Sequence, residues 1–355
     1  MKVYYVQSNL AGCYNVRCLL PLQANGWDGD FTSFIRNFNR PANDKSKAAQ
    51  DADIVVFHRP EDKGKLDLAR ILKSIGKKIV FDNDDTEKDS GGLKLNEFIN
   101  KEMVEKGMKT LNENIDAFIK EADLVTCSTE FLAKEYRELN KKVIVIPNCI
   151  DSFMFDEPLR NETDTVRIGI TGSVAITSDM ELIKPIVEYY KDNKKIKFVL
   201  FSLPPNKEDK FMRKLYEGEY EFWDSLDIEW QPFVPMEEYY TTLNELRLDM
   251  MIIPRADNYF NRCKSNLKFL ESSMLEIPCI CQSFPTGDSP YEVDKEDTQY
   301  LLLATDLKSW ISQIDTLVEN KELRLELGKK AHEYVEKKYD ININAHRWED
   351  AYKTL

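Results

Sequence analysis

The side chains best suited to chemistry gather in one segment, Asp257–Glu271, which combines two lysines and a carboxylate at helical spacing. The pattern predicts a helix over 264–275, with Lys264 in its first turn and Lys268 one turn later. Free N–H groups and partial positive charge make a helix N-terminus suitable for a phosphate or a sugar. Glu271 is expected on a face near both lysines, where its carboxylate can accept hydrogen bonds from two neighbouring hydroxyl groups, as on a ribose.

A second explanation of the lysines stays open. Like charges at i and i+4 repel each other by roughly a few tenths of a kcal/mol, which a solvated helix face tolerates. Glu271 can also neutralise Lys264 or Lys268 without any ligand. We favour the functional interpretation, because a bound pyrophosphate would remove the repulsion between the two lysines.

The pair Gly172-Ser173, after a predicted strand over 166–171, is a second candidate for phosphate binding. Glycine permits tight turns and the close approach of backbone N–H groups to an anion. Taken alone, the pair is equally well explained as a simple turn. Lys264 and Lys268 support the phosphate interpretation, since we expect them across the same cleft.

Acidic residues end another predicted strand, over 77–82, and continue to Asp84 and Asp85. Ligands bind at the carboxyl edge of a parallel sheet. Carboxylates there can orient an acceptor hydroxyl, accept its proton or hold a metal ion. An Asx turn that caps the next helix is the alternative. We assign Asp84 and Asp85 as candidate catalytic residues that position an acceptor.

Two further candidates follow strands. His58 closes a predicted strand over 53–58 and is either catalytic or, more commonly at such a place, a packed or capping side chain. The loop after the first strand approaches the ligand or is an ordinary surface loop. Its candidate acceptor or phosphate contacts are Gly12, Cys13, Tyr14 and Arg17.

These candidates need a scaffold in which strands and helices alternate. Strands are predicted near 2–7, 53–58, 77–82, 123–127, 142–146, 166–171, 196–202, 227–231, 248–253, 278–282 and 299–303. Helices are predicted near 129–139, 179–191, 236–246, 264–275, 307–318 and 320–337, and 86–120 is mostly helical. The alternation predicts two α/β domains with parallel sheets covered by helices on both faces. A polar, turn-rich stretch over 147–163 places the boundary after residue 150.

Composition limits the function classes. The 355 residues carry a net charge of −13, and residues 1–150 are balanced, so the remainder carries the whole excess. Such an acidic chain disfavours generic binding to nucleic acid or anionic membranes. Seven cysteines without a Cys-x-x-Cys pair predict a reducing, cytoplasmic location. Neither a signal peptide nor an apolar run of about 18 residues is visible, so we expect no transmembrane segment.

Several motifs, in order and spacing, resemble retaining GT-B glycosyltransferases of family 4. They include the linker motif Pro-Asn-Gly-hydrophobic-Asp with its preceding strand, the glycine turn of the donor domain, the donor-binding helix and the terminal helices. The stretches that carry the likeness are 122–129, 145–151, 167–173, 264–278 and 323–348. The likeness covers residues 120–350, and the first 120 residues by architecture.

The resemblance implies a GT-B fold, α/β, with two Rossmann-like doubly wound parallel-sheet domains and an interdomain cleft. It implies an acceptor domain over 1–150, a nucleotide-sugar donor domain over 151–335 and a helix over 336–355 that crosses back. The implied enzyme moves a sugar from a UDP- or GDP-linked donor to a glycan or small-molecule hydroxyl, with retention and without a metal or other cofactor. The implied donor-binding residues are Gly172, Ser173, Arg262, Lys264, Ser265, Asn266, Lys268 and Glu271.

The sequence departs from the family at three places. Cys263 replaces the first glutamate of the family's Glu-x7-Glu motif, and Cys149 replaces the linker glycine. The family's arginine after the glycine turn has no clear counterpart in 173–185. We expect Arg262, Lys264 and Lys268 to supply its charge.

Two other functions stay open. Some virus-encoded GT-B enzymes glycosylate modified bases in DNA, which sugar transfer to hydroxymethylated duplex DNA would reveal. Cys263 also allows a nucleotide-sugar-binding protein without catalysis, which would bind nucleotide sugar and turn over no acceptor.

Overall fold

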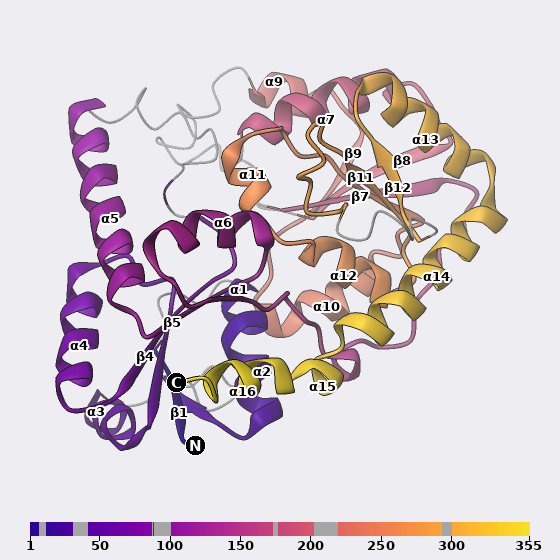
Figure 1. Ribbon diagram of the computed structural model, residues 1–355. Coiled ribbons are helices and arrows are strands. Elements are labelled where there is room, and N and C mark those ends of the chain that lie inside the picture. The colour runs from indigo at the N-terminus through magenta and orange to yellow at the C-terminus, as the bar shows by residue number, and fades with distance from the viewer. Residues whose placement is uncertain are drawn as a thin grey trace.

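The structure is a computed structural model that describes residues 1–6, 12–30, 42–86, 88, 101–172, 177–201, 219–292 and 300–355. Two parallel six-stranded sheets, each covered by helices, form two domains (Figure 1). This confirms the predicted class of two doubly wound α/β domains. The predicted boundary after residue 150 falls between the last strand of the first sheet and the first strand of the second.

The first sheet has the strand order β2-β1-β3-β4-β5-β6. Its strands are β1 Val3–Val6, β2 Asp28–Gly29, β3 Ile54–His58, β4 Lys78–Asn83, β5 Leu124–Cys127 and β6 Val143–Val145. Its helices are α1 Gly12–Tyr14, a π-helical turn Asn15–Leu19, α2 Leu20–Asn25, α3 Ala42–Asp51, α4 Lys63–Ser74, α5 Lys101–Glu121 and α6 Glu130–Leu139. Every residue of β3 is buried, as expected for a strand with helices on both faces.

The second sheet has the order β12-β11-β10-β7-β8-β9. Its strands are β7 Val166–Thr171, β8 Ile196–Phe201, β9 Ile228–Gln231, β10 Met250–Ile253, β11 Cys279–Gln282 and β12 Leu302–Ala304. Its helices are the 3-10 turn Ser152–Met154, α7 Thr177–Tyr190, α9 Glu219–Asp224, α10 Met236–Glu245, α11 Tyr259–Cys263, α12 Leu267–Met274, α13 Leu307–Glu319 and α14 Lys321–Tyr339.

The predicted helix over 264–275 is present as α12, but it begins three residues later than expected, at Leu267. A short helix that was not predicted, α11, ends just before this range, at Cys263. Lys264 is extended (φ −67°, ψ 154°) and lies between them. Lys264 and Lys268 are therefore not neighbours one turn apart on a helix face, and the repulsion expected from that spacing does not apply.

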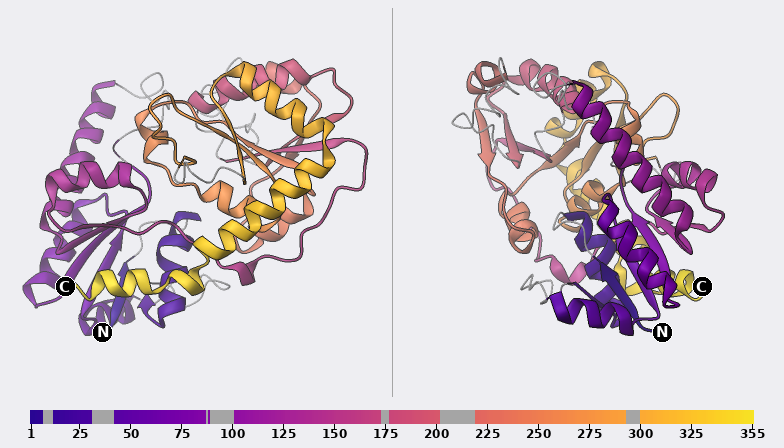
Figure 2. Two further views of the ribbon diagram at one scale, coloured as in Figure 1. Left: turned by 45° about the vertical axis from the view of Figure 1, so that its right-hand side comes forward. Right: turned by 90° about the vertical axis from the view of Figure 1, so that its left-hand side faces the viewer.

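The chain crosses between the domains twice, side by side. The Ile150 N–H donates to the Tyr339 carbonyl (3.0 Å), and the Ile341 N–H donates to the Ile150 carbonyl (2.7 Å). Helices α15 Ile341–Asn344 and α16 His346–Tyr352 then lie along the first domain, in yellow in Figures 1 and 2. Trp348 is fully buried in the same core cluster as residues of β1 and of the π-helical turn Asn15–Leu19.

In the part of the chain that the structure describes, no helix combines the length and the apolar character needed to cross a bilayer.

Candidate functional site

A cavity of about 680 Å³ lies at the carboxyl edge of the second sheet, where parallel sheets bind ligands. Apolar side chains from β7, β8 and β10 and from the loop before α10 form much of its wall. The first domain contributes Gly12 and Cys13 from α1. The polar and charged lining comprises Thr171, Asp179, Glu237, Tyr239, Arg255, Lys264, Lys268 and Glu271.

Gly172 and Lys268 meet at the end of β7. Gly172 has φ +143°, a conformation that L side chains rarely adopt, and a Cβ there would come within 2.9 Å of the Lys268 Nζ. The Lys268 ammonium donates to the Thr171 carbonyl and to the Thr171 hydroxyl (3.0 Å). The glycine thus leaves room for the lysine to lie against the strand end. The other member of the predicted pair, Ser173, lies outside the described residues.

Glu271 lies on α12 and accepts a hydrogen bond from the Tyr239 hydroxyl (3.3 Å). Burial raises the pKa of Glu271, against the opposing effects of Lys268 and Tyr239. Burial also lowers the pKa of Lys268, and the charges of Arg255 and Lys264 lower it further. Burial therefore disfavours charge on both groups, and an anionic ligand would favour the charged lysine.

Arg255 is a functional candidate that the sequence analysis missed. It is 8% exposed, lines the cavity and donates through Nη1 to Asp179 (2.8 Å). Asp179 also accepts from the Ala256 N–H (2.8 Å) and the Asn261 amide (2.7 Å). These bonds hold the guanidinium in place. Its position two residues after β10, at the ligand-binding edge, was a signal that could have identified it.

Three predicted donor-binding residues are absent from the cavity lining. Arg262 pairs with Asp257 (2.7 Å) and Asp288 (3.3 Å), so its charge is already balanced. The Ser265 hydroxyl accepts from the Asn148 amide (2.8 Å). Asn266 occupies the N-cap position of α12 without a side-chain cap bond. Of these two arginines, Arg255 and not Arg262 lines the cavity.

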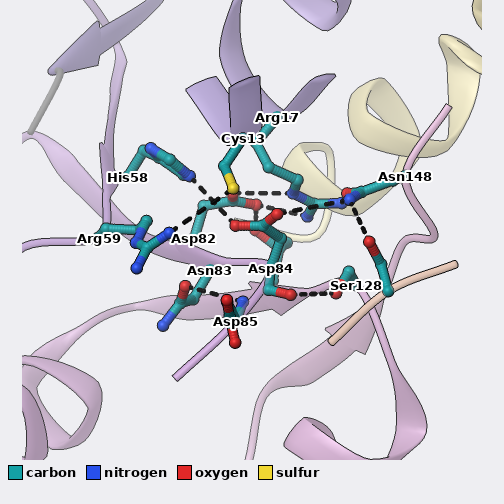
Figure 3. Close-up of polar contacts among 12 residues, drawn as sticks. Cys13, Arg17, His58, Arg59, Asp82, Asn83, Asp84, Asp85, Ser128 and Asn148 are labelled. Atoms are coloured by element: carbon teal, nitrogen blue, oxygen red, sulfur yellow. Dashed lines mark hydrogen bonds and ion pairs between the residues drawn. The ribbon is translucent and has the colours of Figure 1, made fainter. Parts of the chain in front are cut away.

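The first-domain half of the site is a buried polar cluster (Figure 3). The His58 Nε2 lies 3.7 Å from an Asp84 carboxylate oxygen, and both side chains are almost completely buried. Burial alone would raise the pKa of Asp84, but the neighbouring His58 ring and the charges of Arg59 and Arg17 hold it well below its usual range. Neither His58 nor Asp84 lines the cavity, whereas Cys13 does.

Cys13 forms the surface of this half. Its thiol accepts from Arg59 (3.6 Å), and burial, followed by the charge of Asp84, raises its pKa. Cys13 is therefore a neutral thiol and not a thiolate nucleophile.

Arg17 has a different place from the predicted one. It is fully buried and makes a bidentate pair with Asp82, at 3.0 and 2.6 Å. It also donates to the Ile146 carbonyl (2.5 Å). Tyr14 is buried beside the His58 ring, with 6.1 Å between ring centroids. Both residues organise the interior of the first domain, so the phosphate contact expected from Arg17 is not available to a ligand.

Lys264 joins the two halves across the cleft. Its ammonium lies 2.5 Å from the Asp85 carboxylate and 4.0 Å from the centroid of the Phe260 ring. Asp85 belongs to the first domain and Lys264 to the second. One predicted donor-binding residue and one predicted acceptor-positioning residue are thus partners in an ion pair.

The described residues contain no group of three or more His, Cys, Asp or Glu side chains arranged to hold a metal ion. Asp84 and Asp85 are engaged by His58 and Lys264, respectively.

No protein-family model and no curated protein matches the sequence. Solved structures do match. HepE of Anabaena in complex with UDP-glucose is 10% identical, with both chains covered in full and a TM-score of 0.68. Sucrose-phosphate synthase of Thermosynechococcus elongatus is 13% identical, with 100% and 99% of the chains covered and a TM-score of 0.65.

TarM of S. aureus is 14% identical with a TM-score of 0.59, and the match covers 84% of this chain. This chain spans 54% of the length of TarM. At such identities the likeness establishes the fold. The chain matches GT-B glycosyltransferases over its full length, and the predicted GT-B fold is confirmed.

Proposed function

We propose that this protein is a glycosyltransferase that moves a sugar from a nucleoside diphosphate to an acceptor hydroxyl. One observation carries the proposal. Arg255, Lys264 and Lys268 converge with the buried Glu271 in one cavity that opens between the two domains. A diphosphate with a ribose matches this set, because cations pair with its phosphates and a carboxylate accepts from its hydroxyl groups.

The donor lies in the second domain. Lys268, whose ammonium lies against the end of β7, and Arg255, which follows β10, bind the phosphate nearer the nucleoside, and Lys264 binds the distal one. Glu271 accepts hydrogen bonds from the ribose. The apolar wall receives the nucleobase, and a uridine donor is favoured because HepE, which shares the fold, was solved with UDP-glucose.

The reaction needs stabilisation of the leaving group. The bond between the sugar's anomeric carbon and the phosphate oxygen breaks, and a bond from that carbon to the acceptor oxygen forms. The nucleoside diphosphate leaves with the bonding electron pair, and one of its oxygens takes the acceptor proton. The three cations stabilise the developing negative charge from fixed positions.

We propose retention of configuration without a metal ion. The buried positions of His58 and Asp84, behind Cys13, suit a route in which the leaving phosphate and not a side chain takes the proton. Turnover should then survive a strong chelator. Loss of turnover in the chelator, with rescue by Mg²⁺ or Mn²⁺, would show that a metal ion takes part.

The acceptor half belongs to the first domain. We propose a glycan or small-molecule acceptor in a cytoplasmic setting, lying against Gly12 and Cys13, with His58 and Asp84 as positioning residues behind them. Transfer to hydroxymethylated duplex DNA and not to carbohydrate would establish the virus-type alternative instead.

The first experiment is a thermal-shift screen of UDP, GDP, UMP, GMP and uridine. A ligand at roughly one hundred times its Kd stabilises the protein by about 2.7 kcal/mol. We expect the largest shift with UDP, followed by transfer from UDP-sugars to a panel of acceptors. Binding of UDP-sugar without transfer to any acceptor would favour a non-catalytic binding protein. No shift with any diphosphate would contradict the proposal.

A further inference from the structure

The ion pair between Asp85 and Lys264 affects how the donor site can bind an anion. Lys264 lines the cavity, yet its ammonium is already held by a carboxylate of the other domain at 2.5 Å. The pair is largely shielded, with side-chain exposures of 17% for Lys264 and 9% for Asp85. An anion that binds Lys264 must therefore compete with Asp85.

Asp85 is held in position for this contact. One carboxylate oxygen accepts from the Thr86 N–H (2.8 Å), while the other faces Lys264. The Asp85 N–H donates to the Asn83 side chain (3.2 Å). Two local bonds thus fix the loop after β4, so that the carboxylate points across the cleft.

Lys264 is also held. The next residue, Ser265, accepts from Asn148 of the first domain (2.8 Å), and Tyr259 of α11 bonds to Glu135 of α6. Cys263 is fully buried in the core cluster of the first domain. The segment from Tyr259 to Ser265 is therefore docked on the first domain, while α12 with Lys268 belongs to the second.

The two lysines consequently differ. Lys268 bonds to the neutral Thr171 of its own domain, whereas Lys264 bonds to a full negative charge. The Lys268 ammonium lies against the end of β7, and Lys264 faces the first domain. A ligand whose one phosphate pairs with Lys268 and Arg255 would leave the Asp85 pair intact, and a second phosphate would have to meet Lys264.

We propose that Asp85 is a specificity-determining counter-ion of the donor site. Asp85 pairs with Lys264 until the second phosphate of a donor takes the place of Asp85 beside the lysine. The proposal rests on the proposed function, because it needs a nucleoside diphosphate in this cavity. Asp85 competes with the distal phosphate and leaves binding of a monophosphate unaffected. It also regains Lys264 when the diphosphate departs, which favours release of the product.

The test compares UDP, UMP and uridine by isothermal titration with the native protein, Asp85→Asn, Lys264→Met and the double variant. Asparagine keeps the acceptor for the Thr86 N–H and removes the charge. We expect Asp85→Asn to tighten UDP binding by roughly fivefold, with UMP and uridine unchanged. Lys264→Met should weaken UDP binding. Adding Asp85→Asn to Lys264→Met should not increase the UDP affinity, because Asp85 then has no lysine for which to compete.

The matched control is Asp67→Asn, which removes an exposed carboxylate paired with Lys63 on α4. It should leave the affinities for UDP, UMP and uridine unchanged. Unchanged or weaker UDP binding in Asp85→Asn would overturn the counter-ion role, as would a gain that persists without Lys264. If the native protein binds neither UDP nor GDP, the proposed function fails, and the counter-ion role fails with it.

Discussion

The two halves of the cleft carry charge in opposite ways. The second-domain half places Lys268 and Arg255, the latter paired with Asp179, on the wall of a cavity that a ligand can enter. The first-domain half places its charges behind the surface, in closed pairs such as Arg17 with Asp82. A charged side chain near a cleft is thus a candidate binding group in one half and part of the interior in the other. Whether the side chain reaches the cavity wall, and not whether it already has a partner, decides which.

The largest expected effect comes from removing the buried ion pair between Arg17 and Asp82 in the first-domain half. Arg17→Leu leaves the buried Asp82 carboxylate without its bidentate partner, which typically costs about 3–5 kcal/mol. We expect that loss in the free energy of unfolding, measured by urea titration. Arg70→Leu removes an exposed pair with Glu121 and should cost at most about 1 kcal/mol. A stable Arg17→Leu protein that had lost UDP binding would restore the phosphate role predicted from the sequence.

The next effect tests the open half. Lys268→Met removes a cation but little volume, and a charge-assisted hydrogen bond is worth about 1.5–3 kcal/mol. We therefore expect UDP binding to weaken by roughly ten- to a hundredfold while uridine, which lacks phosphates, keeps its affinity. Isothermal titration with both ligands measures the difference. Equal losses for UDP and uridine would show that Lys268 contacts a part of the ligand other than the phosphates. The control is Lys329→Met, on the exposed face of α14.

Glu271→Ala should weaken UDP and uridine alike, by roughly tenfold, because both ligands carry the ribose that the carboxylate binds. The protein should stay folded, as judged by its unfolding temperature without ligand. Glu271→Gln keeps one acceptor oxygen and should lose less. Undiminished uridine affinity in Glu271→Ala would refute the ribose assignment.

The scaffold was predictable from the sequence because buried parallel strands leave a strong local signal. Runs such as Ile54-Val55-Val56-Phe57 are apolar throughout, and each predicted strand has its counterpart in the structure. The short β2, Asp28–Gly29, has no such run and was missed. Boundaries failed where polar residues compete with the helix, as at Ser265 and Asn266 before α12.

The site was predictable in part, since pairing is decided by residues far apart in the chain. The sequence identified Lys268 and Glu271 through their spacing on one helix. It could not show that Arg17 meets Asp82, 65 residues away, or that Lys264 meets Asp85, 179 residues away. Arg255 was overlooked because its place depends on Asp179, which folds beside it from α7, 76 residues earlier in the chain.

The smallest expected effect is the pH dependence of stability that Asp84 contributes in the first-domain half. The folded-state pKa of Asp84 is lowered, so its ionised form stabilises the fold above the unfolded value, about 3.9. That contribution is lost as pH falls through the folded pKa. Asp84→Asn should thus destabilise the protein at pH 7 and progressively less below about pH 4. Urea titrations across this range measure it, and an equal deficit at pH 7 and pH 3 would contradict the assignment.

The paired crossings at Ile150 have a consequence for how the chain is made. Because Trp348 and Tyr352 complete the core around β1, the first domain lacks part of its interior until α16 leaves the ribosome. The second domain is an insert within it, and its strands β7 to β12 are synthesised before α16. We therefore expect the usual order of folding during synthesis to be reversed, with the downstream domain finished first and the upstream one waiting for α16.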